Sequence, residues 1–227
     1  MKKTILLFSA LLIFGNLSAQ DKAALVNPII GTNGMGHTFP GACVPFGLVQ
    51  LSPDTDTIPH NVDGKYQPRA YEYCAGYQHK DSSIVGFSHT HFSGTGHSDL
   101  GDILIMPATG ELKLNPGTAT DPDGGYRSRF SHDTEVSRPG YYEVMLADYG
   151  VKAQLTATKR VGVHKYTFPK EAKNQRIILD MIHGIYNYDG KVLWTNIRVE
   201  NDTLVTGYRI TNGWARTNYT YFAMSFS

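Results

Sequence analysis

Histidine, tyrosine and glycine are concentrated in two neighbouring stretches of the chain, residues 71–79 and 86–99. The stretches read Tyr71-Glu72-Tyr73-Cys74-Ala75-Gly76-Tyr77-Gln78-His79 and Gly86-Phe87-Ser88-His89-Thr90-His91-Phe92-Ser93-Gly94-Thr95-Gly96-His97-Ser98-Asp99. Neutral imidazoles exchange hydrogen bonds with hydroxyl groups, and aromatic rings supply faces for a pyranose ring. If residues 88–92 are extended, His89 and His91 point to the same face. This composition favours one wall of a sugar-binding pocket.

Two other interpretations of the same histidines stay open. Zinc binds imidazole and carboxylate, so His89, His91 and His97 with Asp99 or Asp102 could form a metal site, although their spacing matches no firm signature. Alternatively, the histidines bond buried loop backbone and the glycines only turn the chain. For a single residue this structural role carries as much weight as the sugar role, but for the whole cluster it carries less.

Glycine-rich motifs elsewhere give weaker signals. Residues 31–37 resemble a phosphate-binding loop, but no Lys-Ser or Lys-Thr pair follows and no helical pattern begins there. Residues 121–125 resemble part of a calcium loop without its remaining spacing, so a tight turn is favoured. We expect neither nucleotide nor calcium binding at these motifs.

The charge balance argues against a nucleic-acid partner. The chain has 21 Lys and Arg against 20 Asp and Glu, and no basic stripe that could replace counterions along a phosphate backbone. An uncharged ligand is therefore expected.

The first twenty residues have the three parts of an export signal. Lys2 and Lys3 precede an apolar run at residues 5–14, and small residues lead to Ala19 and Gln20. A bilayer core needs about 20 apolar residues, so this run is too short to span a membrane. We expect a signal peptide at residues 1–20, no membrane span, and a periplasmic or secreted mature chain of residues 21–227.

Short β-rich runs separated by Gly, Pro, Asn and Asp recur along the mature chain, and no long amphipathic helix is visible. The expected strands are residues 44–51, 83–87, 102–106, 141–146, 151–158, 162–168, 176–181, 192–200, 203–211 and 220–226. Residues 148–150 and 200–202 are natural hairpin turns. This pattern predicts an all-β fold, an antiparallel β-sandwich, with long functional loops at residues 31–41, 52–67 and 88–99. Cys43 and Cys74 could pair, but their surroundings favour buried thiols.

Several ordered motifs resemble a known family, the calcium-dependent exo-α-mannosidases of glycoside hydrolase family 92. The resemblance covers nearly all of the mature chain. Its motifs lie at residues 26–32 (VNPIIGT), 36–42 (GHTFPGA), 45–54 (PFGLVQLSPD), 86–96 (GFSHTHFSGTG), 139–142 (PGYY), 153–158 (AQLTAT) and 164–169 (HKYTFP).

The resemblance implies an inverting α-mannosidase whose N-terminal domain is a galactose mutarotase-like supersandwich and whose C-terminal domain is an (α/α)6 barrel. In the family the catalytic carboxylates and most calcium ligands come from the barrel. We therefore expect calcium as cofactor, a mannose-containing glycan as ligand, and the barrel as partner domain. No catalytic residue and no metal ligand is assigned within residues 21–227. The chain ends inside a β-rich run, which suggests a domain that is incomplete at its C-terminus; the alternative is a free-standing, non-catalytic carbohydrate-binding module.

The resemblance also implies which residues form the pocket wall. Tyr71 corresponds to a position where family members often carry a Trp on the leaving-group side, in members that cut α-1,2 linkages. This departure leaves linkage preference open. The full expected substrate-binding set is Tyr71, Glu72, Tyr77, His89, His91, Ser93, Gly94, His37 and Phe39.

Overall fold

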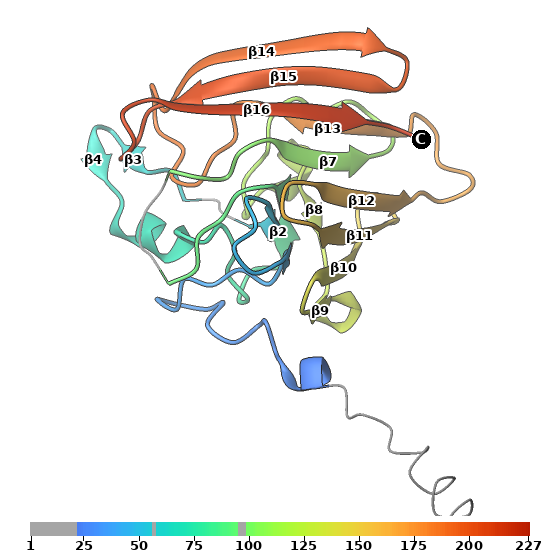
Figure 1. Ribbon diagram of the computed structural model, residues 1–227, viewed down its shortest axis with the longest axis horizontal. Helices are drawn as coiled ribbons and strands as arrows, with labels where there is room; N and C mark the ends of the chain where they lie inside the picture. Colours follow the sequence, from blue (N-terminus) through green and yellow to red (C-terminus); the bar gives the residue numbers. More distant parts are fainter. Residues whose placement is uncertain (1–21, 56–57, 95–98) are drawn as a thin grey trace, which may run out of the picture.

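The computed structural model describes residues 22–55, 58–94 and 99–227. The expected signal peptide and His97 lie outside the described residues. Antiparallel sheets stack on one another in these ranges, and β14, β15 and β16 run across the top of the molecule (Figure 1). The predicted all-β sandwich is confirmed.

Two sheets form the body of the sandwich. The first has five antiparallel strands in the order β1 (Ala42–Cys43), β2 (Gln50–Asp54), β6 (Gly86–Ser88), β7 (Leu104–Ala108) and β13 (Arg176–Asp180). The second has four in the order β12 (Gly162–Thr167), β11 (Val151–Ala157), β10 (Tyr141–Leu146) and β9 (Val136–Arg138).

The core lies between these two sheets. Along β11, Val151, Ala153, Leu155 and Ala157 are buried and alternate with more exposed residues, as a strand with one inward face requires. Phe87 of the first sheet meets Tyr142 of the second, with ring centroids 6.5 Å apart. Burial of these apolar side chains stabilises the two-layer body at about 25 cal/mol per Å² removed from water.

A third sheet and short elements complete the fold. β14 (Val192–Asn201), β15 (Leu204–Thr211) and β16 (Asn218–Ser225) form an antiparallel meander. The small pairs are β3 (Asn61–Val62) with β4 (Lys65–Tyr66), and β5 (Ser83–Ile84) with β8 (Ser128–Arg129). Across the described ranges the helices are all short 3-10 turns: η2 (Lys22–Leu25), η3 (Pro68–Tyr73), η4 (Pro122–Gly124) and η5 (His132–Thr134). No helix among them has the length and apolar character to cross a membrane.

The predicted strands agree with the structure best where they form hairpins. Residues 148–150 turn between β10 and β11, with Gly150 at φ +62°, and Asn201 closes the turn between β14 and β15 by accepting a hydrogen bond from the Thr203 amide. The strand expected at residues 44–51 is wrong over most of its length. Phe46 there has φ +57°, so the backbone turns out of the sheet, and β2 begins only at Gln50. Cys43 and Cys74 are both free thiols.

Candidate functional site

Three loops that the sequence places far apart meet beside His37. The amide of Gly94 donates to the His37 carbonyl oxygen at 2.6 Å, which joins the loop after β6 to the loop before β1. The ring of Tyr71, on η3, meets the His37 ring edge to face at 5.0 Å and 82°. We call His37, Tyr71 and Gly94 with the flanking Phe39 and His91 the loop junction.

His37 is strained and has an unused polar atom. Its φ is +51°, a conformation that non-glycine residues adopt at an energetic cost and that is often found at functional sites. Its imidazole is buried, and its Nε2 has no hydrogen-bond partner among the described residues. A buried nitrogen without a partner is costly, so a ligand hydroxyl here would restore the missing bond.

Gln78 fixes the His37 loop against the segment that carries Tyr71. Its side-chain amide makes two bonds to Gly34, accepting from the Gly34 amide at 2.7 Å and donating to its carbonyl at 2.9 Å. The amide of the next residue, His79, donates to the Thr32 carbonyl at 2.8 Å. These contacts set the position of His37 relative to Tyr71.

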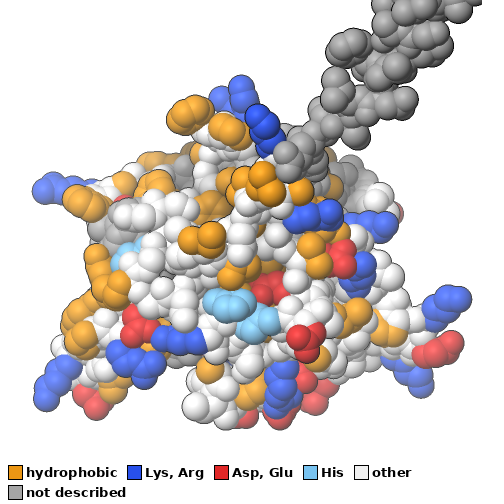
Figure 2. All heavy atoms as spheres, turned by 90° about the horizontal axis from the view of Figure 1, so that it is seen from below, with side chains coloured by type: hydrophobic (Ala, Val, Ile, Leu, Met, Phe, Trp, Pro, Cys, Tyr) orange, Lys and Arg blue, Asp and Glu red, His pale blue; other side chains and the backbone are white. Residues whose placement is uncertain are grey.

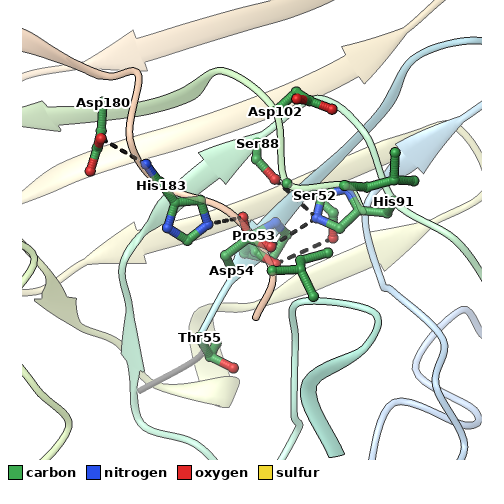
Figure 3. Close-up of polar contacts among 12 residues, drawn as sticks. Ser52, Pro53, Asp54, Thr55, Ser88, His91, Asp102, Asp180 and His183 are labelled. Atoms are coloured by element: carbon green, nitrogen blue, oxygen red, sulfur yellow. Dashed lines mark hydrogen bonds and ion pairs between the residues drawn. The ribbon is translucent and has the colours of Figure 1, made fainter. Parts of the chain in front are cut away.

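His91 is held from behind by a buried carboxylate (Figure 3). Its Nε2 lies 2.8 Å from Asp54 Oδ1 and its Nδ1 lies 2.7 Å from the Gln50 carbonyl oxygen. The Ser88 hydroxyl also lies 3.1 Å from Nε2, so this nitrogen meets both a hydroxyl and the carboxylate. On the other side of Asp54, Oδ2 accepts from Nε2 of His183 at 2.9 Å.

The charge of Asp54 is stabilised by its partners. Burial acts to raise the pKa of the Asp54 carboxyl, but His91 and His183 outweigh it and hold that pKa well below its usual range. Asp180 accepts from the backbone amide of His183 and so positions this second imidazole, as Figure 3 shows. The fixed His91 ring lies 5.3 Å from Phe39, centroid to centroid.

His89 belongs to a different network. Its Nδ1 donates to the Ile103 carbonyl at 2.7 Å, and its Nε2 lies 3.0 Å from Nε2 of His164. Burial lowers the pKa of both imidazoles, and the neighbouring His89 lowers the pKa of His164 further, so we assign two neutral rings. The predicted extended run ends at Ser88. The expected shared face of His89 and His91 is therefore not formed.

The other residues expected in the wall of the sugar pocket differ in their solvent exposure. Tyr77 is buried in the sandwich core and donates to Glu135, while the Glu72 carboxylate pairs with Lys80. Ser93 and Gly94 are exposed, and Tyr71 is exposed enough to meet a ligand. The structure thus brings His37, Phe39, Tyr71, His91 and Gly94 together, with His91 fully buried, and it places Tyr77 in the core and half-buried His89 in a separate network. Their roles in substrate binding stay predictions.

Sequence reasoning missed Asp54 and His183 as supports of His91. His183 is 129 residues from Asp54 along the chain, so only the fold shows that they meet. Asp54 is the last residue of β2, and the residues around it in the sequence do not indicate that its carboxylate supports a histidine.

Calcium has no evident cage in the described parts of the chain. Calcium favours about six to eight oxygen ligands. Within residues 22–55, 58–94 and 99–227, three side chains converge closely enough to hold a metal ion: His79, His132 and Glu135. Two of their three ligand atoms are nitrogen. These residues do not fit calcium.

Comparison with known proteins identifies the family of this chain. Residues 25–227 match the Glycosyl hydrolase family 92 N-terminal domain. The chain therefore belongs to glycoside hydrolase family 92, as its N-terminal domain.

The relatives support this assignment. A family GH92 alpha-mannosidase from Bacteroides thetaiotaomicron, solved with mannoimidazole, is 45% identical with a TM-score of 0.80, over 90% of this chain and 25% of that one. A family GH92 inverting mannosidase from the same species is 27% identical with a TM-score of 0.63, again over 90% of this chain and 25% of that one. An uncharacterized secreted glycosidase from Arthroderma benhamiae is 30% identical over 158 residues, which are 66% of this chain and 18% of that protein. The chain thus spans about a quarter of the length of the solved relatives.

Proposed function

We propose that this chain forms the N-terminal wall of the active site of an exported, inverting α-mannosidase that releases mannose from glycans, with α-1,2 linkages as the preferred substrate. The observation that carries the proposal is the loop junction, where the unpaired Nε2 of buried His37 lies beside the partly exposed ring of Tyr71. One group would bond a sugar hydroxyl and the other would cover a face of the ring.

The acids near this wall already have structural partners. Asp102 accepts from Arg209 and from Thr90, at 2.7 and 2.6 Å, and Asp99 accepts from the amides of Trp214 and Ala215. Inverting hydrolysis needs a proton donor and a carboxylate that activates water. These engagements support our proposal that both groups, and the ligands of an essential calcium ion, come from an (α/α)6 barrel domain.

The surface is suited to a partner domain and to a neutral ligand. Met35, in the loop of His37, is exposed, as are Phe46 and Leu48 ahead of β2. Exposed apolar side chains of this size are available for contact with another domain. On the face in Figure 2, Lys and Arg side chains are interspersed with Asp and Glu and form no single-sign patch.

The test joins this chain to the C-terminal remainder of the 45% identical Bacteroides mannosidase and assays α-mannobioses of each linkage. Tyr71→Ala should lower kcat/KM by about fivefold, the equivalent of about 1 kcal/mol of lost aromatic packing. Tyr221→Ala, on the outer strand β16, is the matched control and should change nothing. Equal kcat/KM for Tyr71→Ala and the unaltered hybrid on every linkage would place Tyr71 outside the pocket.

A further inference from the structure

A second polar cluster, separate from the loop junction, brings two imidazoles onto one carboxylate. Nδ1 of His132 lies 2.6 Å from Glu135 Oε2, and Nδ1 of His79 lies 4.0 Å from the same oxygen. The three ligand atoms all lie within 4.8 Å of one another. His132 and Glu135 come from η5 and the residue that follows it, whereas His79 comes from the far end of the Tyr71 segment.

The carboxylate at the centre is buried and oriented. Only 3% of the Glu135 side chain is exposed, against 40% for His79 and 38% for His132. Tyr142 donates to its Oε1 at 2.6 Å, and Tyr77 donates to both oxygens at 2.9 and 3.0 Å. Hydrogen bonds of this kind to a ligand carboxylate are typical of the shell that supports a bound metal.

Nδ1 of His79 also lies 3.3 Å from the Tyr77 hydroxyl, and the His132 ring packs edge to face on Phe130 at 5.0 Å. The two imidazole rings lie 4.0 Å apart, centroid to centroid, and both present Nδ1 to the same buried carboxylate while staying partly exposed. Two imidazoles and a carboxylate that converge in this way are a common zinc ligand set.

We propose that His79, His132 and Glu135 form a zinc site, with Nδ1 of each histidine and one Glu135 oxygen as protein ligands and water in the fourth position. Zinc accepts nitrogen and carboxylate ligands in a tetrahedral arrangement, whereas calcium prefers oxygen alone. The ion would replace the hydrogen bond between His132 and Glu135 and the contact between His79 Nδ1 and the Tyr77 hydroxyl.

The proposed ion links two parts of the fold. Gln78, beside His79, holds the Gly34 loop, and Tyr142 lies on β10. Zinc would therefore tie the segment of residues 71–79 to the second sheet, at a place where β10 and η5 already meet. This inference does not rest on the proposed mannosidase function.

The test measures zinc binding to the full chain after metal is removed with a chelator. Isothermal titration with a zinc salt should show saturable binding of a single ion, and Co²⁺ should give the visible absorption of a tetrahedral site. His79→Ala and His132→Ala should each weaken zinc binding more than about tenfold. Both side chains are partly exposed, so the variants should keep the unaltered circular dichroism spectrum.

His60→Ala is the control, because His60 packs against Tyr66 and Tyr188 away from the cluster. It should bind zinc as the unaltered chain does. The absence of saturable zinc binding would overturn the proposal, as would affinity that stays unchanged in both His79→Ala and His132→Ala.

Discussion

His37 combines a strained backbone with a buried ring nitrogen, Nε2, that lacks a hydrogen-bond partner among the described residues. A left-handed conformation costs an L-residue about 1–2 kcal/mol relative to glycine, which has no Cβ to crowd the following carbonyl. The retained histidine at φ +51° therefore suggests that its imidazole is needed at the loop junction.

Comparing His37→Gly with His37→Ala isolates this strain. Both variants lose the ring and its contact with Tyr71, but only glycine relieves the backbone. We expect His37→Gly to have a free energy of unfolding about 1 kcal/mol above that of His37→Ala in urea titrations. Equal stability of the two variants would show that residue 37 is not strained.

Asp54 is the buried charge on which His91 depends. Asp54→Asn removes the buried carboxylate that both His91 and His183 contact. Breaking a buried ion pair on one side costs about 3–5 kcal/mol, so we expect a loss of this size in the free energy of unfolding. Urea denaturation at neutral pH measures it, and a loss below about 1 kcal/mol would contradict the charged pair.

The pH dependence of stability follows from the same residue. The folded-state pKa of Asp54 is lowered, so its contribution is complete above the unfolded pKa of about 3.9 and is lost as the pH falls below that value. Between pH of about 4 and 2 the unaltered chain should lose stability more steeply than Asp54→Asn. Parallel curves for the two proteins would argue against this role.

At the scale of elements, Gly76 lets the Tyr71 segment lie directly on β2. Its φ is +80°, and a Cβ there would overlap Asp54 Oδ1 and crowd the His91 ring. Gly76→Ala therefore carries a steric cost in addition to the conformational one. Gly140, at φ +75° with open space around it, provides a matched control.

We expect Gly140→Ala to lower the free energy of unfolding by about 1 kcal/mol and Gly76→Ala to lower it by at least about 2 kcal/mol more. Chemical denaturation of both variants checks the difference. Similar losses would mean that the segment of residues 71–79 moves away from Asp54 without cost.

The strands were predictable where one face is buried and a local turn sets the pairing. β10 and β11 alternate apolar and polar residues around the turn at residues 148–150, so periodicity and turn chemistry gave nearly their bounds. β8 and β9, with two and three residues, were missed because such short strands have no period to detect. Residues 44–49 were misjudged because β-rich composition does not reveal the positive φ at Phe46.

The candidate site was predictable in composition but only partly in geometry. The clustering of His and Tyr indicated the loops that meet at His37, and the exposed Tyr71 lies there. Whether a histidine faces a ligand or the core depends on partners far along the chain. His164 draws His89 inward, 75 residues away, and no local pattern encodes that contact.

At the scale of the molecule, Asp54 and Asp102 have structural roles, whereas Tyr71 and Gly94 of the loop junction are exposed. Asp54 joins β2 to the segment after β13, and Asp102 joins the loop before β7 to β15 through buried Arg209. The Asp54 pair thus holds elements of the first sheet together, and the Asp102 pair connects the first sheet to the third. Protonation or release of either acid would disturb the fold, which makes both unsuitable as exchangeable proton donors.

We therefore expect this chain, purified alone, to release no mannose from α-linked mannobioses, with or without calcium. Inverting hydrolysis places a general acid and a general base on opposite sides of the scissile bond, about 6.5–9.5 Å apart, and one wall of a pocket cannot supply both. The assay incubates the chain with each mannobiose and compares released mannose with a heat-inactivated sample; the hybrid carrying the Bacteroides remainder is the active control. Turnover by the chain alone that disappears in Asp99→Asn or Asp102→Asn would show that these acids are catalytic and that the chain is a small enzyme in its own right.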